Sequence, residues 1–338
     1  MADFKLLNQV LAADIKEVTT VADADIKQIG GASRAAAAGS TKSMHFVRET
    51  GATLVAYSDS PSDFSPVNVA IGGGGSGAYS FSIWMKPAEF GGSGEGFNRP
   101  NSIFHVGGGG SGATTSRRMS IYGIRGAGDI KGRNRLIFES GGRVYGGAGR
   151  YFLTNELPAS FADFSTWSHV VGTYPGGSGA TATGSIYIDG VYQLGTGSSG
   201  GGIGDPGVWP GVDRGASLGT GDTTSALSAF SGNLCDAAVW DKELSQAEVT
   251  TIYGGGSRVD LSTTGPTGNI IAWWKMGDGV EIGSNGVATA TTDSTTRIYN
   301  QTSSLANWPA IVTANYSRQG FEMTGSSFAA GAIQEDSP

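Results

Sequence analysis

The chain has 338 residues, of which 38% are hydrophobic, so it can form one large domain with appendages or two domains. Its net charge of −7 and its 15% content of charged residues argue against nucleic acid and anionic membranes as partners, because both need a basic surface. No stretch approaches the roughly 18 apolar residues of a membrane helix, and the start lacks the basic and apolar blocks of a secretory signal. We therefore expect neither membrane insertion nor secretory export.

The first forty residues carry a short internal repeat. Residues 13–18 read Ala-Asp-Ile-Lys-Glu-Val, and residues 24–29 read Ala-Asp-Ile-Lys-Gln-Ile. Each copy is too short to bury a face alone, which predicts packing on a partner or on a neighbouring subunit. Residues 1–40 are predicted to be an anchoring arm, with a partly ordered leader as the alternative. The apolar positions expected to make the contact are Ile15, Val18, Ile26 and Ile29.

Beyond residue 40 the pattern is that of strands separated by glycine-dense turns. The 57 glycines cluster between runs rich in aromatic and β-branched residues, and they lack the three-residue period of collagen. In residues 79–85 large apolar residues alternate with mostly small polar ones, as in a half-buried strand, and Pro87 is predicted to end it. Further strands are expected at 102–106, 119–124, 135–139 and 167–174.

The most specific local signals lie in the second half of the chain. Asp189 and Gly190 stand between two apolar runs, which predicts a hairpin with a tight primed turn. Ser245 and Glu248 have the spacing of a capping box, so one short helix is expected to begin there and to end at Gly254. Residues 269–276 form another strand, in which Trp273 and Trp274 would place one ring on each sheet face.

The order of these segments resembles the laminin G-like, or concanavalin A-like lectin, superfamily. The resemblance rests on residues 81–87, 167–174, 186–190 and 230–240, the last leading into 244–248. It implies an all-β jelly roll of two antiparallel sheets over residues 41–264, with ligands held at one rim or on the concave sheet. Residues 265–338 would complete this sandwich or form a small second β unit. The repeat in the leader resembles N-terminal segments of bacteriophage structural proteins.

Catalysis is not expected. Glycosidases of this superfamily place their acids as Glu-x-Asp-x-Glu on one strand, and that pattern is absent. Glu139 and Asp189 stand alone, and the two dinucleotide-like glycine patterns open no helix. The single cysteine, Cys235, excludes an internal disulfide and a cysteine-based zinc site. His169, which alternates with apolar neighbours, is expected to be a hydrogen-bonded core residue.

Two sets of residues are candidates for ligand contact. Exposed aromatic rings that could stack on a sugar or bury in a subunit contact are Trp209, Tyr192 and Trp308. Aspartates that could hold calcium at a rim of the sandwich are Asp59, Asp236 and Asp278, with solvated or turn-capping roles as the alternative. Calcium is the one cofactor that the sequence leaves open.

Taken together, these features predict a non-enzymatic virion structural protein. The arm would attach it to capsid or tail proteins, and the sandwich would decorate the particle or bind host-surface glycans. The absence of an export signal fits assembly in the host cytoplasm, and we expect a homo-oligomer. A free carbohydrate-binding lectin and a glycan hydrolase are the alternatives.

Overall fold

In the computed structural model the chain divides into two units, residues 1–39 and residues 40–338. The described residues are 28–29, 32–33, 42–46, 48–49, 52–53, 55–58, 77–89, 101–106, 119–125, 134–140, 150–176, 184–199, 216–219, 230–279, 297–298, 301, 321–324, 333–334 and 338. In the first unit, β1 (Gln28–Ile29) pairs antiparallel with β2 (Ala32–Ser33). Ile29 lies in β1, whereas Ile15, Val18 and Ile26 lie outside the described residues.

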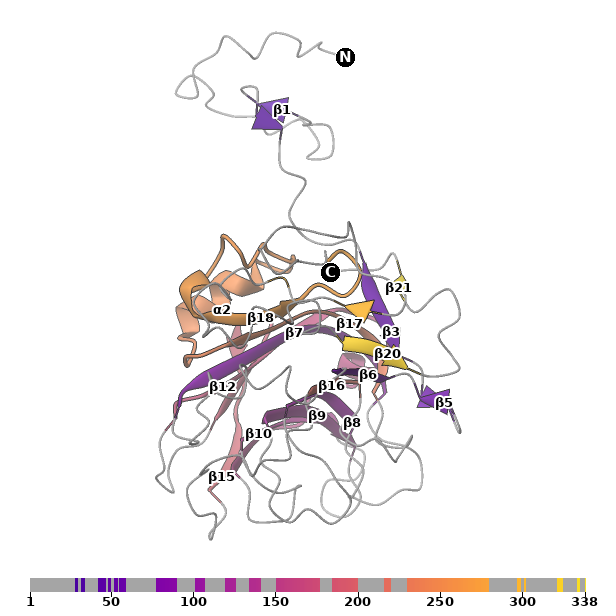
Figure 1. The fold of residues 1–338 in the computed structure, drawn as a ribbon. Helices are drawn as coiled ribbons and strands as arrows, with labels where there is room; N and C mark the ends of the chain where they lie inside the picture. Colours follow the sequence, from indigo (N-terminus) through magenta and orange to yellow (C-terminus); the bar gives the residue numbers. More distant parts are fainter. Residues whose placement is uncertain are drawn as a thin grey trace, which may run out of the picture. The chain divides into compact units, whose positions relative to one another are not determined.

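The second unit is built from two large antiparallel sheets, which confirms the predicted sandwich (Figure 1). The eight-stranded sheet has the order β14-β13-β12-β7-β17-β3-β21, with β18 paired to β17. Its strands are β3 (Ser43–Phe46), β7 (Tyr79–Glu89), β12 (Ser168–Tyr174), β13 (Ser185–Ile188), β14 (Val191–Tyr192), β17 (Ser231–Trp240), β18 (Ile270–Trp274) and β21 (Ile333–Gln334).

The nine-stranded sheet has the order β15-β11-β10-β9-β8-β16-β6-β20-β19. Its strands are β6 (Val55–Ser58), β8 (Asn101–Val106), β9 (Met119–Arg125), β10 (Asn134–Ser140), β11 (Arg150–Thr154), β15 (Gly195–Ser199), β16 (Ala216–Leu218), β19 (Arg297–Ile298) and β20 (Phe321–Thr324). A separate pair joins β4 (Arg48–Glu49) to β5 (Ala52–Thr53). Strands β18, β20 and β21, all beyond residue 264, pair with strands of the sandwich.

The main core fills the space between the sheets. Along β7, every second side chain from Phe81 to Met85 points into it. Phe81, Ile83 and Met85 are fully buried, and the Phe81 ring stacks on Phe104 of β8 at 4.0 Å. Gly172 leaves room for the Phe138 ring, because a Cβ at this glycine would lie 2.4 Å from a carbon of that ring. Burying a large apolar side chain of this kind contributes about 1.5–3 kcal/mol, so this layer carries much of the stability.

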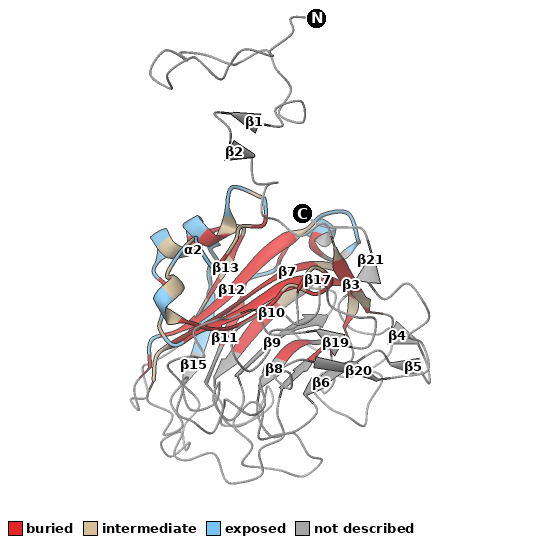
Figure 2. Cartoon of the chain, turned by 45° about the horizontal axis from the view of Figure 1, so that its top comes forward, coloured by how far each residue is buried: buried red, intermediate tan, exposed pale blue. Residues whose placement is uncertain are grey.

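A second core covers the outer face of the eight-stranded sheet, beneath helix α2 (Gln246–Tyr253). Figures 1 and 2 show α2 on the face of this sheet that points away from β8, β9 and β10. The two tryptophans of β18 divide between the cores as predicted, with Trp274 in the main core and Trp273 in the outer one. Two short 3-10 turns, η6 (Ala159–Ala162) and η8 (Thr267–Asn269), complete the described helical segments.

The local turn and cap predictions are confirmed. Asp189 and Gly190 have φ angles of 51° and 77°, the pair of positive values that a primed turn requires. The Ser245 side chain accepts from the Glu248 backbone N–H, the glutamate reaches back, and Gly254 ends the helix with a φ of 63°. No helix in the described part of the chain is long and apolar enough to cross a membrane.

One local prediction is wrong, because β7 does not end at Pro87. The strand continues to Glu89, and Pro87 lies opposite Gly232 of β17 beside a shift in register. Proline lacks a backbone N–H and is tolerated in a sheet where the ladder is already interrupted. On the other side of β7, pairing with β12 ends at Met85, so Pro87 breaks no regular ladder there.

Candidate functional site

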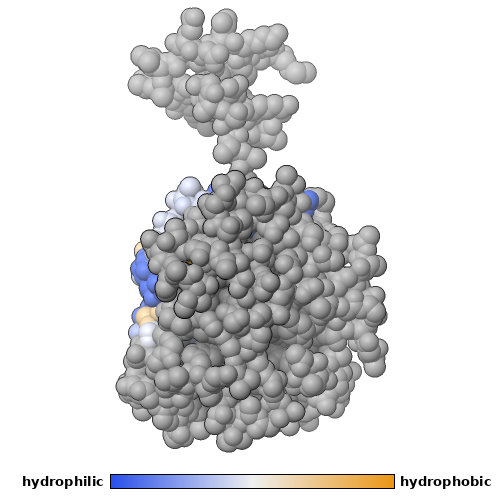
Figure 3. All heavy atoms as spheres, in the orientation of Figure 1, coloured by the Kyte–Doolittle hydropathy of each residue, from blue (hydrophilic) through white to orange (hydrophobic). Residues whose placement is uncertain are grey.

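An exposed apolar surface lies at the β13–β14 hairpin, on one edge of the eight-stranded sheet. Val191, Tyr192 and Leu194 are 62%, 44% and 70% exposed, although scattered single apolar residues are normal on a surface. Here three gather within four positions, next to the half-buried Tyr187. We call Tyr187, Val191, Tyr192, Leu194 and the neighbouring Glu243 the hairpin surface. On the face that Figure 3 shows, most of the coloured atoms at the left margin are white to blue, which marks hydrophilic residues.

The hairpin surface is exposed because one short segment forms the edges of both sheets. β14 is the last strand of the eight-stranded sheet, and the chain then passes directly into β15, the last strand of the nine-stranded sheet. The connection is held at both sides: the Gln193 N–H donates to the Ile186 carbonyl at 2.9 Å, and the Leu194 carbonyl accepts from the Asn155 N–H at 2.8 Å. The exposed side chains therefore project from a fixed backbone.

The two tyrosines form a cross-strand pair. Tyr187 lies opposite Tyr192, and their rings meet edge to face with centroids 5.6 Å apart. The Tyr192 ring also lies 6.1 Å from Phe152 of the main core, and Tyr187 packs against the outer core. Each aromatic ring is thus supported on its inner side, while Tyr192 remains open to solvent.

Glu243 is an exposed residue in the connection between β17 and α2, close enough to Tyr187 to affect its pKa. Partial burial raises the pKa of Glu243. The pKa of Tyr187 is also raised, first by burial and then by the nearby Glu243 carboxylate. Seven other carboxylates of residues 150–176, 184–199 and 230–279 have a hydrogen-bond or ion-pair partner, namely Asp163, Asp189, Asp236, Asp241, Glu248, Asp260 and Asp278.

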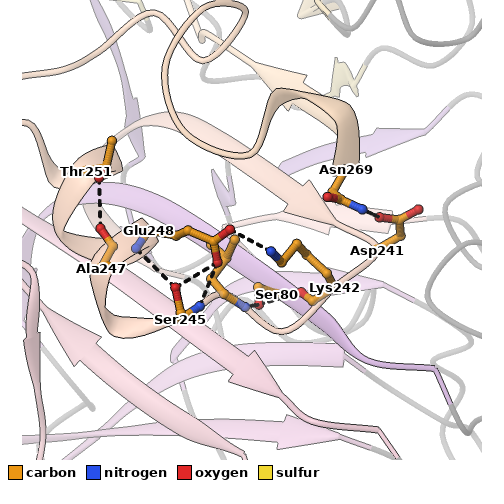
Figure 4. Close-up of polar contacts among 9 residues, drawn as sticks. Ser80, Asp241, Lys242, Ser245, Ala247, Glu248, Thr251 and Asn269 are labelled. Atoms are coloured by element: carbon orange, nitrogen blue, oxygen red, sulfur yellow. Dashed lines mark hydrogen bonds and ion pairs between the residues drawn. The ribbon is translucent and has the colours of Figure 1, made fainter.

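The neighbours of Glu243 are fully engaged in polar contacts (Figure 4). Ser80 of β7 donates through its hydroxyl to the Lys242 carbonyl at 2.8 Å and accepts from the Leu244 N–H at 2.9 Å. The Lys242 ammonium lies 2.6 Å from a Glu248 oxygen. Partial burial raises the pKa of Glu248, but hydrogen bonds from Lys242 and Ser245 outweigh it, so the pKa is lowered overall. These contacts hold the backbone on both sides of Glu243 in place.

The helix and the hairpin are tied together directly. The Gln246 side chain donates to the Gly190 carbonyl at 2.6 Å, which joins the first turn of α2 to the hairpin turn. A Cβ at Gly190 would lie 3.1 Å from the Tyr253 ring, so the turn also packs closely on the end of α2. The hairpin turn and helix α2 are therefore held against each other.

His169 of β12 lies next to Asp189 of the hairpin turn and is buried, as predicted. Its ring packs with those of Trp84 and Tyr253, whose centroids lie 5.0 and 6.2 Å away and 5.8 Å from each other, and its backbone N–H donates to the Asp189 carboxylate at 2.8 Å. Burial lowers the pKa of His169 to about 3, so the imidazole is neutral at physiological pH. Its Nδ1 has no hydrogen-bond partner within the described structure, which differs from the predicted hydrogen-bonded histidine.

Two of the predicted calcium aspartates lie around a buried arginine, Arg258. Its Nε donates to Asp236, and its two Nη groups donate to the Lys42 and Lys275 carbonyls at 2.9 and 3.1 Å. Burial alone would lower the pKa of Arg258, but the Asp236 carboxylate outweighs this and the pKa is raised. The second Asp236 oxygen accepts from Trp273 at 2.9 Å. We call these residues the arginine cluster.

Asp278 lies nearby and accepts the Lys42 N–H at 3.1 Å. Among the residues that the structure describes, no three His, Cys, Asp or Glu side chains gather as a metal site would require. Asp59, Trp209 and Trp308 lie outside the described residues, so calcium at the aspartates stays a prediction. Of the three candidate aromatic residues, the structure describes Tyr192 alone.

Sequence reasoning identified Tyr192 but missed Tyr187 and Glu243. Alternation in β13 places Tyr187 on the face opposite Ile186 and Ile188, so its outward position could have been inferred. Nothing in the sequence marks Glu243, because its nearness to the hairpin depends on how α2 packs on the sheet.

Comparison with known proteins gives a match to one family and several distant structural similarities. The family model described as the concanavalin A-like lectin/glucanases superfamily matches residues 62–250, more than half of the chain. No curated protein matches the chain.

Three solved structures illustrate the distant similarities. A heptameric SAP-like pentraxin from Limulus polyphemus is 14% identical, with a TM-score of 0.38 over 63% of this chain and 81% of the pentraxin. A putative carbohydrate-binding protein from Bacteroides ovatus is 15% identical, with a TM-score of 0.45 over 87% of this chain and 59% of that protein. A tailspike protein from an Escherichia coli bacteriophage is 13% identical, with a TM-score of 0.42 over 69% of this chain and 26% of the tailspike.

Proposed function

The chain belongs to the concanavalin A-like lectin/glucanases superfamily, and from this premise we propose that it binds carbohydrate without catalysis, through the hairpin surface. The observation that carries the proposal is the exposed Tyr192 ring, which is supported by Phe152 and paired edge to face with Tyr187. Sugars present apolar C–H faces that pack on aromatic rings, and their hydroxyls donate to carboxylates. The hairpin surface offers both on a rigid support.

The distribution of carboxylates favours binding over hydrolysis. Glycoside hydrolysis ordinarily needs two carboxylic groups flanking one bond, and the hairpin surface contains a single one. Asp189, the nearest other carboxylate on the hairpin, accepts the His169 N–H. Burial raises the pKa of Asp189, and this hydrogen bond works in the opposite direction. Asp189 therefore serves the turn, which leaves Glu243 without a catalytic companion.

Substitution of Tyr192 tests the proposal. The full chain is screened on a glycan array, and affinities of the hits are measured by titration calorimetry. We expect Tyr192→Ala to weaken binding about two- to tenfold, since an aromatic stacking contact contributes on the order of 0.5–1.5 kcal/mol. Phe164→Ala is the matched control, because Phe164 is a 40% exposed aromatic in another loop. Equal losses in both variants, or no glycan bound by the unaltered chain, would refute the proposal.

The wider role that we propose is a virion structural protein, with residues 1–40 attaching the sandwich to capsid or tail proteins after assembly in the host cytoplasm. Its support is the internal repeat and the division of the chain into units 1–39 and 40–338. Deleting residues 1–40 should abolish incorporation into particles and spare glycan binding by the sandwich. Normal incorporation of this truncation would favour a free lectin instead.

A further inference from the structure

We propose that the Tyr253 ring is a cover over His169, that it opens when the imidazole takes up a proton, and that this opening frees the hairpin turn. Acid then weakens ligand binding at the hairpin surface, a last step that rests on the proposed carbohydrate binding. The residues concerned lie where β12, the hairpin turn and the end of α2 meet.

His169 has no route to water through the sheet. It lies in β12, whose seven residues are all buried and which is paired on both sides, with β7 and with β13. Only 2% of His169 is exposed, and its Nδ1 has no hydrogen-bond partner within the described structure. A protonated imidazole has two N–H donors that need acceptors or water. His169 can therefore hold a proton only if a neighbouring element moves aside.

The neighbouring element that can move is the end of α2. The Tyr253 ring is half-buried, and its centroid lies 6.2 Å from that of His169 and 5.8 Å from that of Trp84. Tyr253 is the last residue of an eight-residue helix, and it is followed by three glycines, residues 254–256, with φ angles of 63°, 69° and 100°. A helix this short depends on packing, and its ends open first. Trp84, in contrast, is held within the sheet by both neighbours of β7.

No described group near the ring provides a counter-charge for an imidazolium. The Asp189 carboxylate of the hairpin turn accepts the His169 backbone N–H, and the Tyr253 phenol belongs to the cover itself. On β13 the titratable side chain is Tyr187, which lies opposite Val171, and β7 supplies a tryptophan, which does not titrate. Burial therefore lowers the pKa of His169 to about 3. In the open form the imidazole is hydrated and its pKa returns toward 6.5, so falling pH favours opening.

The cover also supports the hairpin turn. A Cβ on Gly190 would lie 3.1 Å from the Tyr253 ring, so the turn and the ring are in close contact. The turn leads directly into β14, which contains Tyr192. Movement of Tyr253 removes this packing from the turn, and the affinity of the hairpin surface for its ligand should fall as the cover opens.

The first test follows the ionisation of His169 by NMR in the full chain with labelled histidine rings, where His169→Phe identifies the signal. In the unaltered chain we expect a midpoint about one pH unit or more below 6.5. In Tyr253→Ala the imidazole is uncovered, so the midpoint should rise toward 6.5. Phe164→Ala is the matched control, because the Phe164 ring stacks on His45 with centroids 6.0 Å apart. It should leave the His169 midpoint unchanged. An ordinary midpoint in the unaltered chain, or a midpoint that Tyr253→Ala leaves low, would overturn the cover.

The second test measures the opening by hydrogen exchange, with each amide compared with its intrinsic rate at the same pH. Between pH 6.5 and pH 3 the opening constant should rise by up to about tenfold per pH unit, because the open form binds one more proton. Protection at the end of α2 should fall accordingly in the unaltered chain and stay level in His169→Phe. A fall of equal size in β7, or in both proteins, would mean that acid unfolds the chain elsewhere and that the local opening is wrong.

Ligand affinity across the same pH range tests the coupling to the hairpin surface. The affinity for the glycans found on the array should decline in acid in the unaltered chain, and this decline should be lost in His169→Phe. A constant affinity while the cover opens would refute the coupling and leave the cover standing. If the array shows no glycan, the proposed function fails, and the NMR and exchange measurements still decide whether Tyr253 covers His169.

Discussion

Two carboxylates only seven residues apart, Asp236 and Glu243, have opposite environments. Asp236 belongs to the arginine cluster, where both of its oxygens accept hydrogen bonds in the buried interior. Glu243 lies at the hairpin surface and has no partner in the described structure. An unpaired charge in the interior strongly destabilises the folded state, whereas an exposed charge can stay unpaired at small cost. Pairing, more than residue type, therefore separates the structural carboxylate from the candidate functional one.

The same comparison explains what the arginine cluster contributes. Arg258 connects β17, the end of β18 and the residue that enters β3, because it bonds Asp236, the Lys275 carbonyl and the Lys42 carbonyl. Arg258 and Lys42 are 216 residues apart in the sequence. The cluster therefore joins the beginning of the sandwich to its last central strand.

The largest effect is expected from Arg258→Ala. This change leaves the Asp236 carboxylate buried without its cation, so the free energy of unfolding should fall by about 3–5 kcal/mol. Urea denaturation at neutral pH measures it. Lys242→Ala is the control, since its ion pair with Glu248 is partly exposed on both sides, 32% and 27%, and should cost about 1 kcal/mol or less. Similar losses in the two variants would mean that burial does not distinguish the two ion pairs.

An intermediate effect is expected from His169, which is buried like Asp236 but avoids the cost of a buried charge by staying neutral. Its folded-state pKa of about 3 is below the unfolded value of 6.5. Its contribution to stability is therefore complete above pH 6.5 and is lost as the pH falls toward 3. His169→Phe keeps an aromatic ring against Trp84 and Tyr253 and removes the titrating group.

Urea denaturation across this pH range checks the prediction. The free energy of unfolding of His169→Phe should fall less steeply below pH 6.5 than that of the unaltered chain. Carboxylates such as Glu248 also lose stabilising contacts in acid, but they do so in both proteins, so the difference isolates the histidine. Parallel curves would show that His169 is protonated without cost in the folded protein.

Much of the fold could be predicted because its signals are local. The Asp189–Gly190 turn, the Ser245–Glu248 capping box and the alternation in β7 each depend on residues within a few positions. The failure at Pro87 is also informative, because the register shift that accommodates this proline arises in β17, far away in sequence.

The candidate site was less predictable for the same reason. Tyr192 could be named from its residue type, but its support by Phe152 and the effect of Glu243 on the pKa of its partner Tyr187 depend on long-range packing. The sequence likewise cannot tell whether Asp236 has a metal ion or an arginine as its counter-charge, because Arg258 follows 22 residues later through a helix and two turns. Residue type identifies a possible ligand, and only the fold identifies its partner.

The smallest effect on the free energy of unfolding is expected from Glu243→Gln, because Glu243, unlike Asp236, has no partner in the described structure. Because partial burial raises the pKa of Glu243, its ionised form slightly opposes folding at neutral pH. Glutamine should therefore change the free energy of unfolding by no more than about 0.5 kcal/mol, and in the stabilising direction if at all. Ser245→Ala, two residues away, should cost about 1 kcal/mol by removing the helix cap. If urea denaturation shows Glu243→Gln to be as costly as Ser245→Ala, then Glu243 is a structural carboxylate like Asp236. If it is neutral, any change in sugar binding by the same variant does not come from a loss of stability, because the fold that holds the tyrosines is intact.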